Sequence, residues 1–349
     1  MTAHRVLRRF AVAAGIALAA AGCSRDSNPI TGDKSSPNDG WLPLPAMPTP
    51  RFIAGGAVAN GKFYIVGGRN NVNVANHSEA DTVLEAYDPV SAKWSKLAPM
   101  PTRRYDVAAG SVNGIVYAVG GWEWVGNYIG PSTRLEAYDP STDTWSARAP
   151  MRDARFGPTV AVANGILYVM GGVDSAMGLY DTGQLVGPLT SVVEAYDPAT
   201  DSWTTKASPP GLINASGAGV VNGIIYVVGG LTFTGDGISA RVYAYDPSTN
   251  TWTEKAPMPT ERYGLDVGVV NGIVYAVGGL GGSAWQYLAT VEAYDPATDT
   301  WTEKPPISMP RYFLNVAGIG DRLYAVGGGQ TNDRGIDAVT GLLEVYAPK

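Results

Sequence analysis

Five arginines, each followed directly by an aromatic residue, are the side chains in this sequence best suited to binding a ligand. They recur at one position of a repeating pattern and are Arg51, Arg104, Arg155, Arg262 and Arg311. A guanidinium group binds a carboxylate through two parallel hydrogen bonds, so a convergent set would favour an anionic ligand. Alternatively, a position repeated this often belongs to the construction of the repeat itself and satisfies loop carbonyls. The sequence leaves both interpretations open.

A second group of candidate binding residues consists of aromatic side chains outside the repeated positions. Of nine tryptophans, six recur at a constant position and three do not. These three tryptophans lie in two segments, each with a tyrosine nearby, and the group is Trp122, Trp124, Tyr128, Trp285 and Tyr287. Such rings can form a platform that stacks on a sugar ring, a peptide or another flat ligand. They can also pack against one another as small cores of long loops, and both roles stay open.

Residues in catalytic patterns are scarce. The histidines are His4 and His77, and the single cysteine is Cys23. This composition leaves no Ser-His-Asp triad, no paired-histidine zinc site and, beyond the first residues, no cysteine nucleophile. Acidic loop residues such as Asp333 and Asp337 lack the regular spacing of a calcium loop. We therefore expect no cofactor and no metal, and the excess of acidic over basic residues argues against nucleic acid as a partner.

The elements that would position these side chains are repeated β-strands. Residues 271–279, Asn-Gly-Ile-Val-Tyr-Ala-Val-Gly-Gly, form an apolar run between an Asn-Gly turn and a Gly pair, which is typical of a buried strand. Close copies end at Gly68, Gly121, Gly172, Gly230 and Gly328. A Tyr-Asp-Pro strand follows most Gly pairs, and a Trp precedes each copy of the arginine position. Each repeat therefore holds four strand-sized segments in about 50 residues, which fits one blade of a β-propeller.

The Gly pair, the Tyr before it, and the spaced Tyr and Trp after it resemble the Kelch repeat. The resemblance covers residues 41–349 and implies an all-β fold, a six-bladed Kelch β-propeller with four antiparallel strands per blade around a central channel. The last repeat ends without its Trp-bearing strand, and the matching segment begins at Trp41. The N-terminal strand should therefore complete the last blade, which leaves the ring without unpaired sheet edges. The resemblance also implies that the repeated arginines surround the channel mouth, where some family members contact ligands.

The repeats differ in length at one place, between the second and third strands. Because strand direction alternates, these loops should all lie on one face of the ring, together with the segments that enter each first strand. We call this face the loop face. The non-repeated tryptophans belong to it, and the fourth repeat interrupts the arginine pattern there with Ile213 and Asn214.

The N-terminal segment indicates export. Residues 1–22 contain basic residues followed by a short apolar run, which is typical of a secretory signal. Cys23 lies where a bacterial lipoprotein signal places its acylated residue, although Ala20 stands where such signals usually have Leu. Residues 23–40 are rich in Ser, Asn, Asp, Pro and Gly, and indicate a flexible tether. The sequence therefore predicts an exported monomer in the cell envelope, held at the bacterial outer membrane by a lipid anchor alone.

Two functions are compatible with these features. The favoured one is a non-enzymatic module whose loop face binds a protein, a peptide or a glycan. The alternative resembles the periplasmic Kelch sialic-acid mutarotases, which open and close a sugar acid without a metal. The arginines would hold the carboxylate, and Glu123 or Glu261 would transfer the proton. Copper chemistry of the galactose oxidase type is argued against, because this chain lacks the His and Cys residues that such a site requires.

Overall fold

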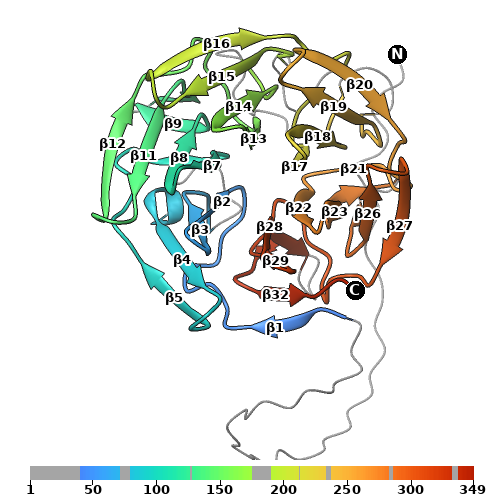
Figure 1. The fold of residues 1–349 in the computed structure, drawn as a ribbon. Coiled ribbons are helices and arrows are strands. Elements are labelled where there is room, and N and C mark those ends of the chain that lie inside the picture. Colours follow the sequence, from blue (N-terminus) through green and yellow to red (C-terminus); the bar gives the residue numbers. More distant parts are fainter. Residues whose placement is uncertain are drawn as a thin grey trace, which may run out of the picture. The chain divides into compact units, whose positions relative to one another are not determined.

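A computed structural model describes residues 40–70, 79–125, 128–174, 190–211, 213–232, 237–282, 286–331 and 337–349. Residues Asp39–Lys349 form one compact unit, built from antiparallel sheets arranged in a ring (Figure 1). The predicted signal, Cys23 and the tether up to residue 39 lie outside the described residues. In the part of the chain that is described, no helix is long and apolar enough to cross a membrane.

Six four-stranded sheets among the described residues form the blades, numbered here by the chain order of their first strands. The first strands lie nearest the ring axis (Figure 1) and are β2 (Gly55–Ala59), β7 (Ala108–Val112), β13 (Thr159–Ala163), β17 (Gly217–Val221), β22 (Asp266–Val270) and β28 (Asn315–Ile319). The second strands are β3 (Lys62–Val66), β8 (Ile115–Val119), β14 (Ile166–Met170), β18 (Ile224–Val228), β23 (Ile273–Val277) and β29 (Arg322–Val326). The third strands are β4 (Leu84–Asp88), β11 (Leu135–Asp139), β15 (Val193–Asp197), β19 (Val242–Asp246), β26 (Val291–Asp295) and β32 (Leu343–Tyr346). The outermost strands are β5 (Lys93–Lys96), β12 (Thr144–Arg148), β16 (Ser202–Lys206), β20 (Thr251–Lys255), β27 (Thr300–Lys304) and, in blade 6, β1 (Leu42–Leu44).

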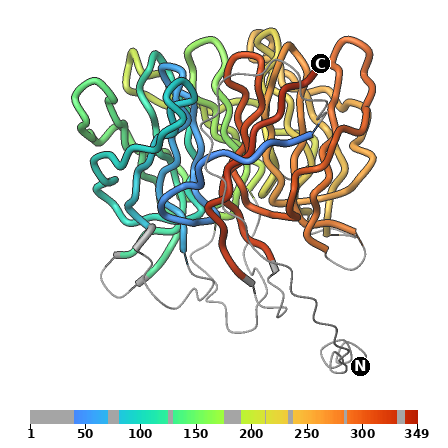
Figure 2. The backbone as a smooth tube through the Cα atoms, turned by 90° about the horizontal axis from the view of Figure 1, so that it is seen from below, coloured from blue at the N-terminus to red at the C-terminus, as the bar shows by residue number. Residues whose placement is uncertain are grey.

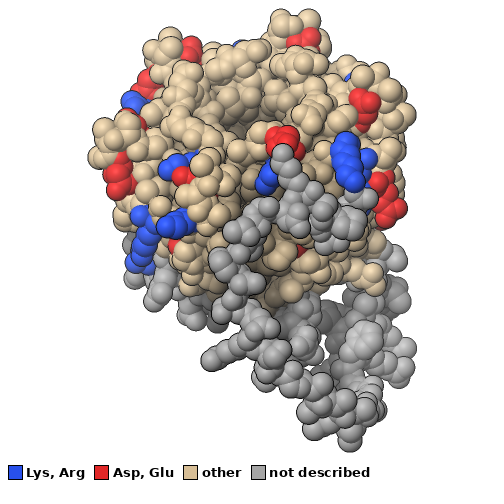
Figure 3. All heavy atoms as spheres, turned by 60° about the horizontal axis from the view of Figure 1, so that its bottom comes forward, with Lys and Arg blue, Asp and Glu red and all other residues tan. Residues whose placement is uncertain are grey.

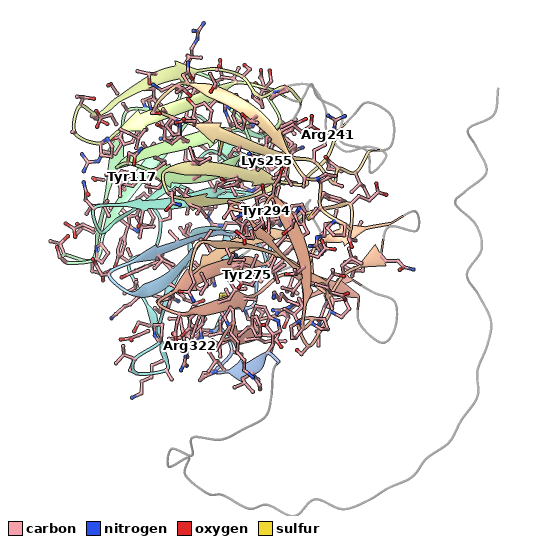
Figure 4. All side chains as sticks on the ribbon, turned by 45° about the vertical axis from the view of Figure 1, so that its right-hand side comes forward. Tyr117, Arg241, Lys255, Tyr275, Tyr294 and Arg322 are labelled. Carbon is pink, nitrogen blue, oxygen red and sulfur yellow. The ribbon has the colours of Figure 1, made fainter. Side chains whose placement is uncertain are left out.

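The apolar second strands are buried on both faces because neighbouring blades stack on one another. On β23, for example, Val274, Tyr275, Ala276 and Val277 are all buried. Tyr294 of blade 5 packs against Tyr226 of blade 4, with ring centroids 5.7 Å apart, and Figure 4 shows Tyr275 and Tyr294 within the stacked sheets. The strand repeat predicted from the sequence is therefore confirmed.

Strand β1 closes the ring, as predicted. It pairs antiparallel with β32, and Leu42 lies opposite Val345. The Trp41 ring stacks on Tyr346 with centroids 5.6 Å apart, and Figure 2 shows the blue N-terminal strand crossing the red C-terminal strands. The first strands contact one another in an unbroken cycle, from β2 through β7, β13, β17, β22 and β28 back to β2.

The repeated tryptophans join each blade to the one before it. Their indole N–H groups donate to backbone carbonyls of the preceding blade over 2.7 to 2.9 Å, and the donors are Trp41, Trp94, Trp145, Trp203, Trp252 and Trp301. The Gly pairs also lie at the junctions between neighbouring blades. A Cβ atom on Gly67 would lie 2.6 Å from the carbonyl oxygen of Arg104 in the next blade, so this position has no room for a side chain. The residues that define the repeat therefore mostly make contacts between neighbouring blades.

The loop face exists as predicted. Segments entering the first strands pair with segments leaving the second strands: β6 (Arg104–Tyr105) pairs with β9 (Trp122–Val125), and β21 (Arg262–Tyr263) with β24 (Leu280–Gly281). The remaining elements of this face are β10 (Tyr128–Pro131), β25 (Gln286–Tyr287), β30 (Gly329–Thr331), β31 (Asp337–Val339) and the 3-10 helix η1 (Glu79–Thr82). The hairpins β9–β10 and β30–β31 project on the same side of the ring (Figure 2).

Candidate functional site

The five repeated arginines lie inside the blades, not on a binding surface. Every one of them is 0% exposed. Each pairs with a glutamate on the third strand of its own blade, and the pairs are Arg51–Glu85, Arg104–Glu136, Arg155–Glu194, Arg262–Glu292 and Arg311–Glu344. This burial contradicts the interpretation that the arginines form an exposed ligand-binding ring. It agrees with the other interpretation, that they belong to the construction of the repeat.

Arg104 illustrates the hydrogen bonds that such a buried arginine makes. Its Nη2 donates to Glu136 Oε2 at 2.7 Å, and its Nη1 donates to the carbonyl oxygens of Gly120 and Arg134 at 2.9 and 3.2 Å. These carbonyls lie at the two ends of the loop between the second and third strands, so the guanidinium group fixes the base of that loop. Burial lowers the pKa of the matching Arg311 to about 10, against the opposing effect of its carboxylate partner, so the group stays charged at neutral pH.

Blade 4 replaces both members of the pair. Ile213 stands at the arginine position and Tyr243 at the glutamate position, and both are buried. A Cβ atom on Gly211 would lie 2.5 Å from the Tyr243 hydroxyl oxygen, so the glycine makes room for the tyrosine. A buried glutamate without its arginine would be costly, which explains why the two positions differ together. Comparing the repeats at both positions could have identified the ion pair from sequence.

Neither of the non-repeated tryptophans of blade 2 is an exposed side chain. Trp122 is 8% exposed, and its ring stacks on Phe156 of blade 3 with centroids 4.2 Å apart. This ring packs between two blades, as in the second role considered above. Trp124 is half-buried on β9. Of Tyr128, only the backbone in β10 is described.

The aromatic residues of blade 5 lie elsewhere on the ring. Tyr287, on β25, is half-buried and contacts the Tyr312 ring edge to face, with centroids 5.1 Å apart. Trp285 lies outside the described residues. Blades 2 and 5 stand on opposite sides of the ring (Figure 1), so Trp122 and Tyr287 belong to separate clusters.

The two glutamates considered for proton transfer also belong to different blades, blade 2 and blade 5. Glu123, on β9 of blade 2, accepts hydrogen bonds from Ser132 Oγ at 2.7 Å and from Arg134 Nε at 2.6 Å. Glu261 is exposed on the segment that enters blade 5. Glu123 therefore serves to hold the β9–β10 hairpin against the strand that follows it.

The ring encloses a cavity of about 450 Å³ that is lined by the first strands of all six blades. Figure 3 shows a hollow at the centre of the face opposite the loop face, bordered mainly by uncharged residues. At the loop face, the cavity is bordered by the residue two positions after each arginine position. We call this set the collar, and its members are Ile53, Asp106, Gly157, Ala215, Gly264 and Phe313.

The collar is held in place by its backbone. All six residues have positive φ angles, between 46° and 61°, a conformation that costs a non-glycine residue about 1–2 kcal/mol. Hydrogen bonds from collar residues to the collar residue of the preceding blade compensate this cost. The N–H of Asp106 donates to the Ile53 carbonyl at 2.8 Å, and that of Gly157 to the Asp106 carbonyl at 3.1 Å. The mouth of the cavity is therefore preformed.

Two aspartates line this mouth, and sequence reasoning missed both. Asp106 belongs to the collar, and Asp266 begins β22. Both residues are half-buried, and the loss of water around their carboxyl groups raises the pKa of each to about 7. Asp266 accepts the backbone N–H groups of Val267 and Val316 at 2.8 and 2.7 Å, so it ties blade 5 to blade 6. No residue that the structure describes donates a hydrogen bond to the Asp106 carboxylate, and burial alone shifts its pKa.

A comparison of the six repeats could have singled out Asp106. The other five repeats have Ile, Gly, Ala, Gly and Phe at the collar position, and only blade 2 carries a charge there. A charged residue at a position that is otherwise small or apolar indicates a role particular to that blade.

Comparison with known proteins matches this architecture. The family model for the Kelch motif matches residues 50–101, 103–152, 154–210, 214–259 and 261–308. Kelch repeat and BTB domain-containing protein 12 from Homo sapiens is 31% identical over 203 residues, which are 55% of this chain and 32% of that protein. Kelch-like protein 40 from Xenopus tropicalis is 32% identical over 196 residues, 56% of this chain and 29% of that protein. The chain thus spans about a third of these relatives. A solved structure titled "Structure of YjhT" superposes with a TM-score of 0.72 at 20% identity, covering 86% of this chain and 95% of the other.

Proposed function

Because the chain belongs to the Kelch-motif family, whose members generally mediate protein interactions, we propose that it binds a protein or peptide partner on its loop face. The observation that carries the proposal is the channel mouth. It is a preformed cavity with a rigid collar, and the Asp106 carboxylate there has no hydrogen-bond donor among the described residues. Pockets that are largely preformed and hold a few polar groups are the usual form of a binding site.

The construction of the ring supports this role. The buried Arg–Glu pairs lie inside five blades, and in blades 2, 3, 5 and 6 the arginine also donates to a carbonyl at the base of the variable loop. The tryptophan hydrogen bonds join the blades to one another. Loops that differ from blade to blade therefore start from a constant frame. A rigid scaffold that carries variable loops is a common arrangement for recognition, because the loops can change without disturbing the fold.

The sugar-acid mutarotase is the weaker proposal. It needed the repeated arginines for the substrate carboxylate, and those guanidinium groups are paired inside the blades. It also needed a glutamate for proton transfer: Glu123 is engaged with Ser132 and Arg134, and Glu261 is exposed on the segment that enters blade 5, away from the residues that line the cavity. Among the described residues that line the cavity, the charged ones are Asp106 and Asp266. Two carboxylates would repel a sugar acid.

The predicted export and lipid anchor fit a binding module and remain part of the proposal. Acylation at Cys23 would hold the ring at the cell envelope, on a tether of residues 23–40. A ring displayed in this way would meet partners of the envelope or of the surroundings, and a glycan is among the ligands to be tested.

The test is a screen of the purified protein against a peptide array and a glycan array, repeated with two variants. The double variant Gln286→Arg and Met309→Arg changes exposed residues of the loop face. The control, Val90→Arg, changes a residue that is 96% exposed on the turn between β4 and β5, at the opposite face. We expect peptide ligands whose affinity falls at least tenfold in the double variant and is unchanged in the control. Equal binding by all three proteins, or no ligand above background, would overturn the proposal.

A further inference from the structure

We propose that the channel mouth is a pocket for one basic side chain, a lysine or an arginine, presented by the partner. The Asp106 carboxylate is the counter-ion, and Phe313 and Ile53 contact the aliphatic part of the incoming side chain. The inference rests on the proposed function in one respect, namely that the partner is a protein or a peptide.

The first support is a pair of oxygen atoms that both lie close to Gly157. A Cβ atom on Gly157 would lie 3.3 Å from Asp106 Oδ2 and 3.2 Å from Asn214 Oδ1. Asn214 is 4% exposed, and its side chain makes no hydrogen bond to any residue that the structure describes. Because Gly157 has no side chain, the place between the two acceptors is open. Two acceptors without a donor between them suit an ammonium or guanidinium group.

The second support is the charge of the cavity. Its described lining contains Asp106 and Asp266 and no lysine, arginine or histidine. Asp266 already accepts two backbone N–H groups, so Asp106 is the carboxylate that an added cation would reach. Burial disfavours the charged form of Asp106, and a cation beside the carboxylate would reverse that effect.

The third support is the apolar side of the collar, which adjoins Asp106. Phe313, Ile53 and Asp106 follow one another around the ring, because the N–H of Ile53 donates to the Phe313 carbonyl and that of Asp106 to the Ile53 carbonyl. The Phe313 ring lies against Gly264, 3.5 Å from the place of a Cβ atom on that residue. The stem of a lysine or arginine is apolar and its head is charged, so a carboxylate next to apolar side chains matches both parts. An aromatic ring nearby also attracts a cation.

The test uses the tripeptide N-acetyl-Gly-Lys-Gly-amide as the probe, titrated into the purified protein and followed by ligand-observed NMR. The matched probe carries an acetyl group on the lysine Nζ, which removes the charge and keeps the stem. The variant Asp106→Asn removes the carboxylate. Its control, Asp321→Asn, makes the same change of charge at a side chain that is 82% exposed.

We expect the lysine probe to bind, the acetylated probe to give no measurable binding, and Asp106→Asn to raise Kd at least tenfold while Asp321→Asn leaves it unchanged. Equal binding of both probes, or binding unaffected by Asp106→Asn, would overturn the inference, because any attraction would then come from the net negative charge of the protein. A melting temperature for Asp106→Asn confirms that this variant is folded.

The two proposals can fail separately. Peptides from the array that contain no basic residue and bind Asp106→Asn normally would refute the basic-side-chain pocket and leave the loop-face function standing. An array without any peptide ligand would refute the loop-face function, whatever the tripeptide does.

Discussion

Substitution of Arg104 by isoleucine should destabilise the protein strongly, because it leaves the buried Glu136 carboxylate without its cation. The pair is joined at 2.7 Å and its side chains are 0% and 7% exposed. Breaking a buried ion pair by removing one partner costs about 3–5 kcal/mol. The Arg104 guanidinium also donates to three backbone carbonyls, those of Gly120, Arg134 and Ala118, which lose a hydrogen bond as well.

Blade 4 supplies the matched control. Its Gly211, Ile213 and Tyr243 occupy the positions of Thr102, Arg104 and Glu136 in blade 2. The triple variant Thr102→Gly, Arg104→Ile and Glu136→Tyr therefore installs an arrangement that the ring already contains. Since replacing a buried ion pair by well-packed uncharged residues is often neutral, we expect this variant to recover stability to within about 1–2 kcal/mol of the original protein.

The assay is urea unfolding followed by circular dichroism, with free energies compared at equal m-values. Arg241→Ile provides a surface control, because Arg241 (Figure 4) pairs with Glu254 at 3.2 Å while both side chains are more than half exposed. It should change the free energy of unfolding by less than about 1 kcal/mol. If Arg104→Ile costs no more than Arg241→Ile, the buried pairs do not hold the blades. If the triple variant is no better than Arg104→Ile, the two positions are not coupled.

Four further predictions concern the ring, the aromatic residues, the collar and the anchor. Trp41→Ala should lower the free energy of unfolding by about 3–5 kcal/mol, since this ring stacks on the C-terminal strand and closes the tryptophan hydrogen bonds; an unchanged urea midpoint would contradict closure by β1. Trp122→Ala should cost a similar amount, whereas Val90→Ala at an exposed turn should stay within about 0.5 kcal/mol; similar melting temperatures for the two would show that Trp122 is not a packing residue. Burial raises the pKa of Asp106 to about 7 from about 3.9 in the unfolded chain. The stability that this carboxyl contributes is therefore fully present below about pH 4 and is lost as the pH rises through about 7, so the melting temperature of Asp106→Asn should rise relative to the unsubstituted protein over that window. A difference that is independent of pH would refute this. Cys23→Ser should move the protein out of the membrane fraction, and its retention there after a salt wash would contradict the lipid anchor.

The fold could be predicted from the sequence because the same pattern of strand residues occurs in every repeat. Six copies of one strand, with a Gly pair and a Trp at constant offsets, allow only a ring of similar blades, and the displaced segment at Trp41 indicates how the ring closes. Among the described residues, the six four-stranded sheets confirm the first point and the pairing of β1 with β32 confirms the second. These features are local in sequence, which is why they could be recognised without coordinates.

The candidate site could be predicted only in part, because burial depends on packing between distant segments. Arg104 and Glu136 are 32 positions apart, and no local sequence pattern indicates that their side chains are in contact. The joint replacement of both residues in blade 4, by Ile213 and Tyr243, is the sequence feature that indicates the contact. The sequence left open whether Trp122 is an exposed stacking residue or a packing residue, because the spacing of residues gives no measure of contacts between blades. The stacking of Phe156 of blade 3 on its ring buries it.

The pairing of β1 with β32 also determines the order in which the protein can assemble. Trp41 hydrogen-bonds to the carbonyl oxygen of Pro305, 264 positions later in the chain. During synthesis the first strand therefore has no partner until nearly the whole chain has been made, while blades 1 to 5 each consist of consecutive segments and can form earlier. The last and slowest step of folding should be the docking of β1, because contacts this distant in sequence form late. Until then the outer edge of blade 6 is open, and it is the place where a second unfinished chain could insert its own first strand.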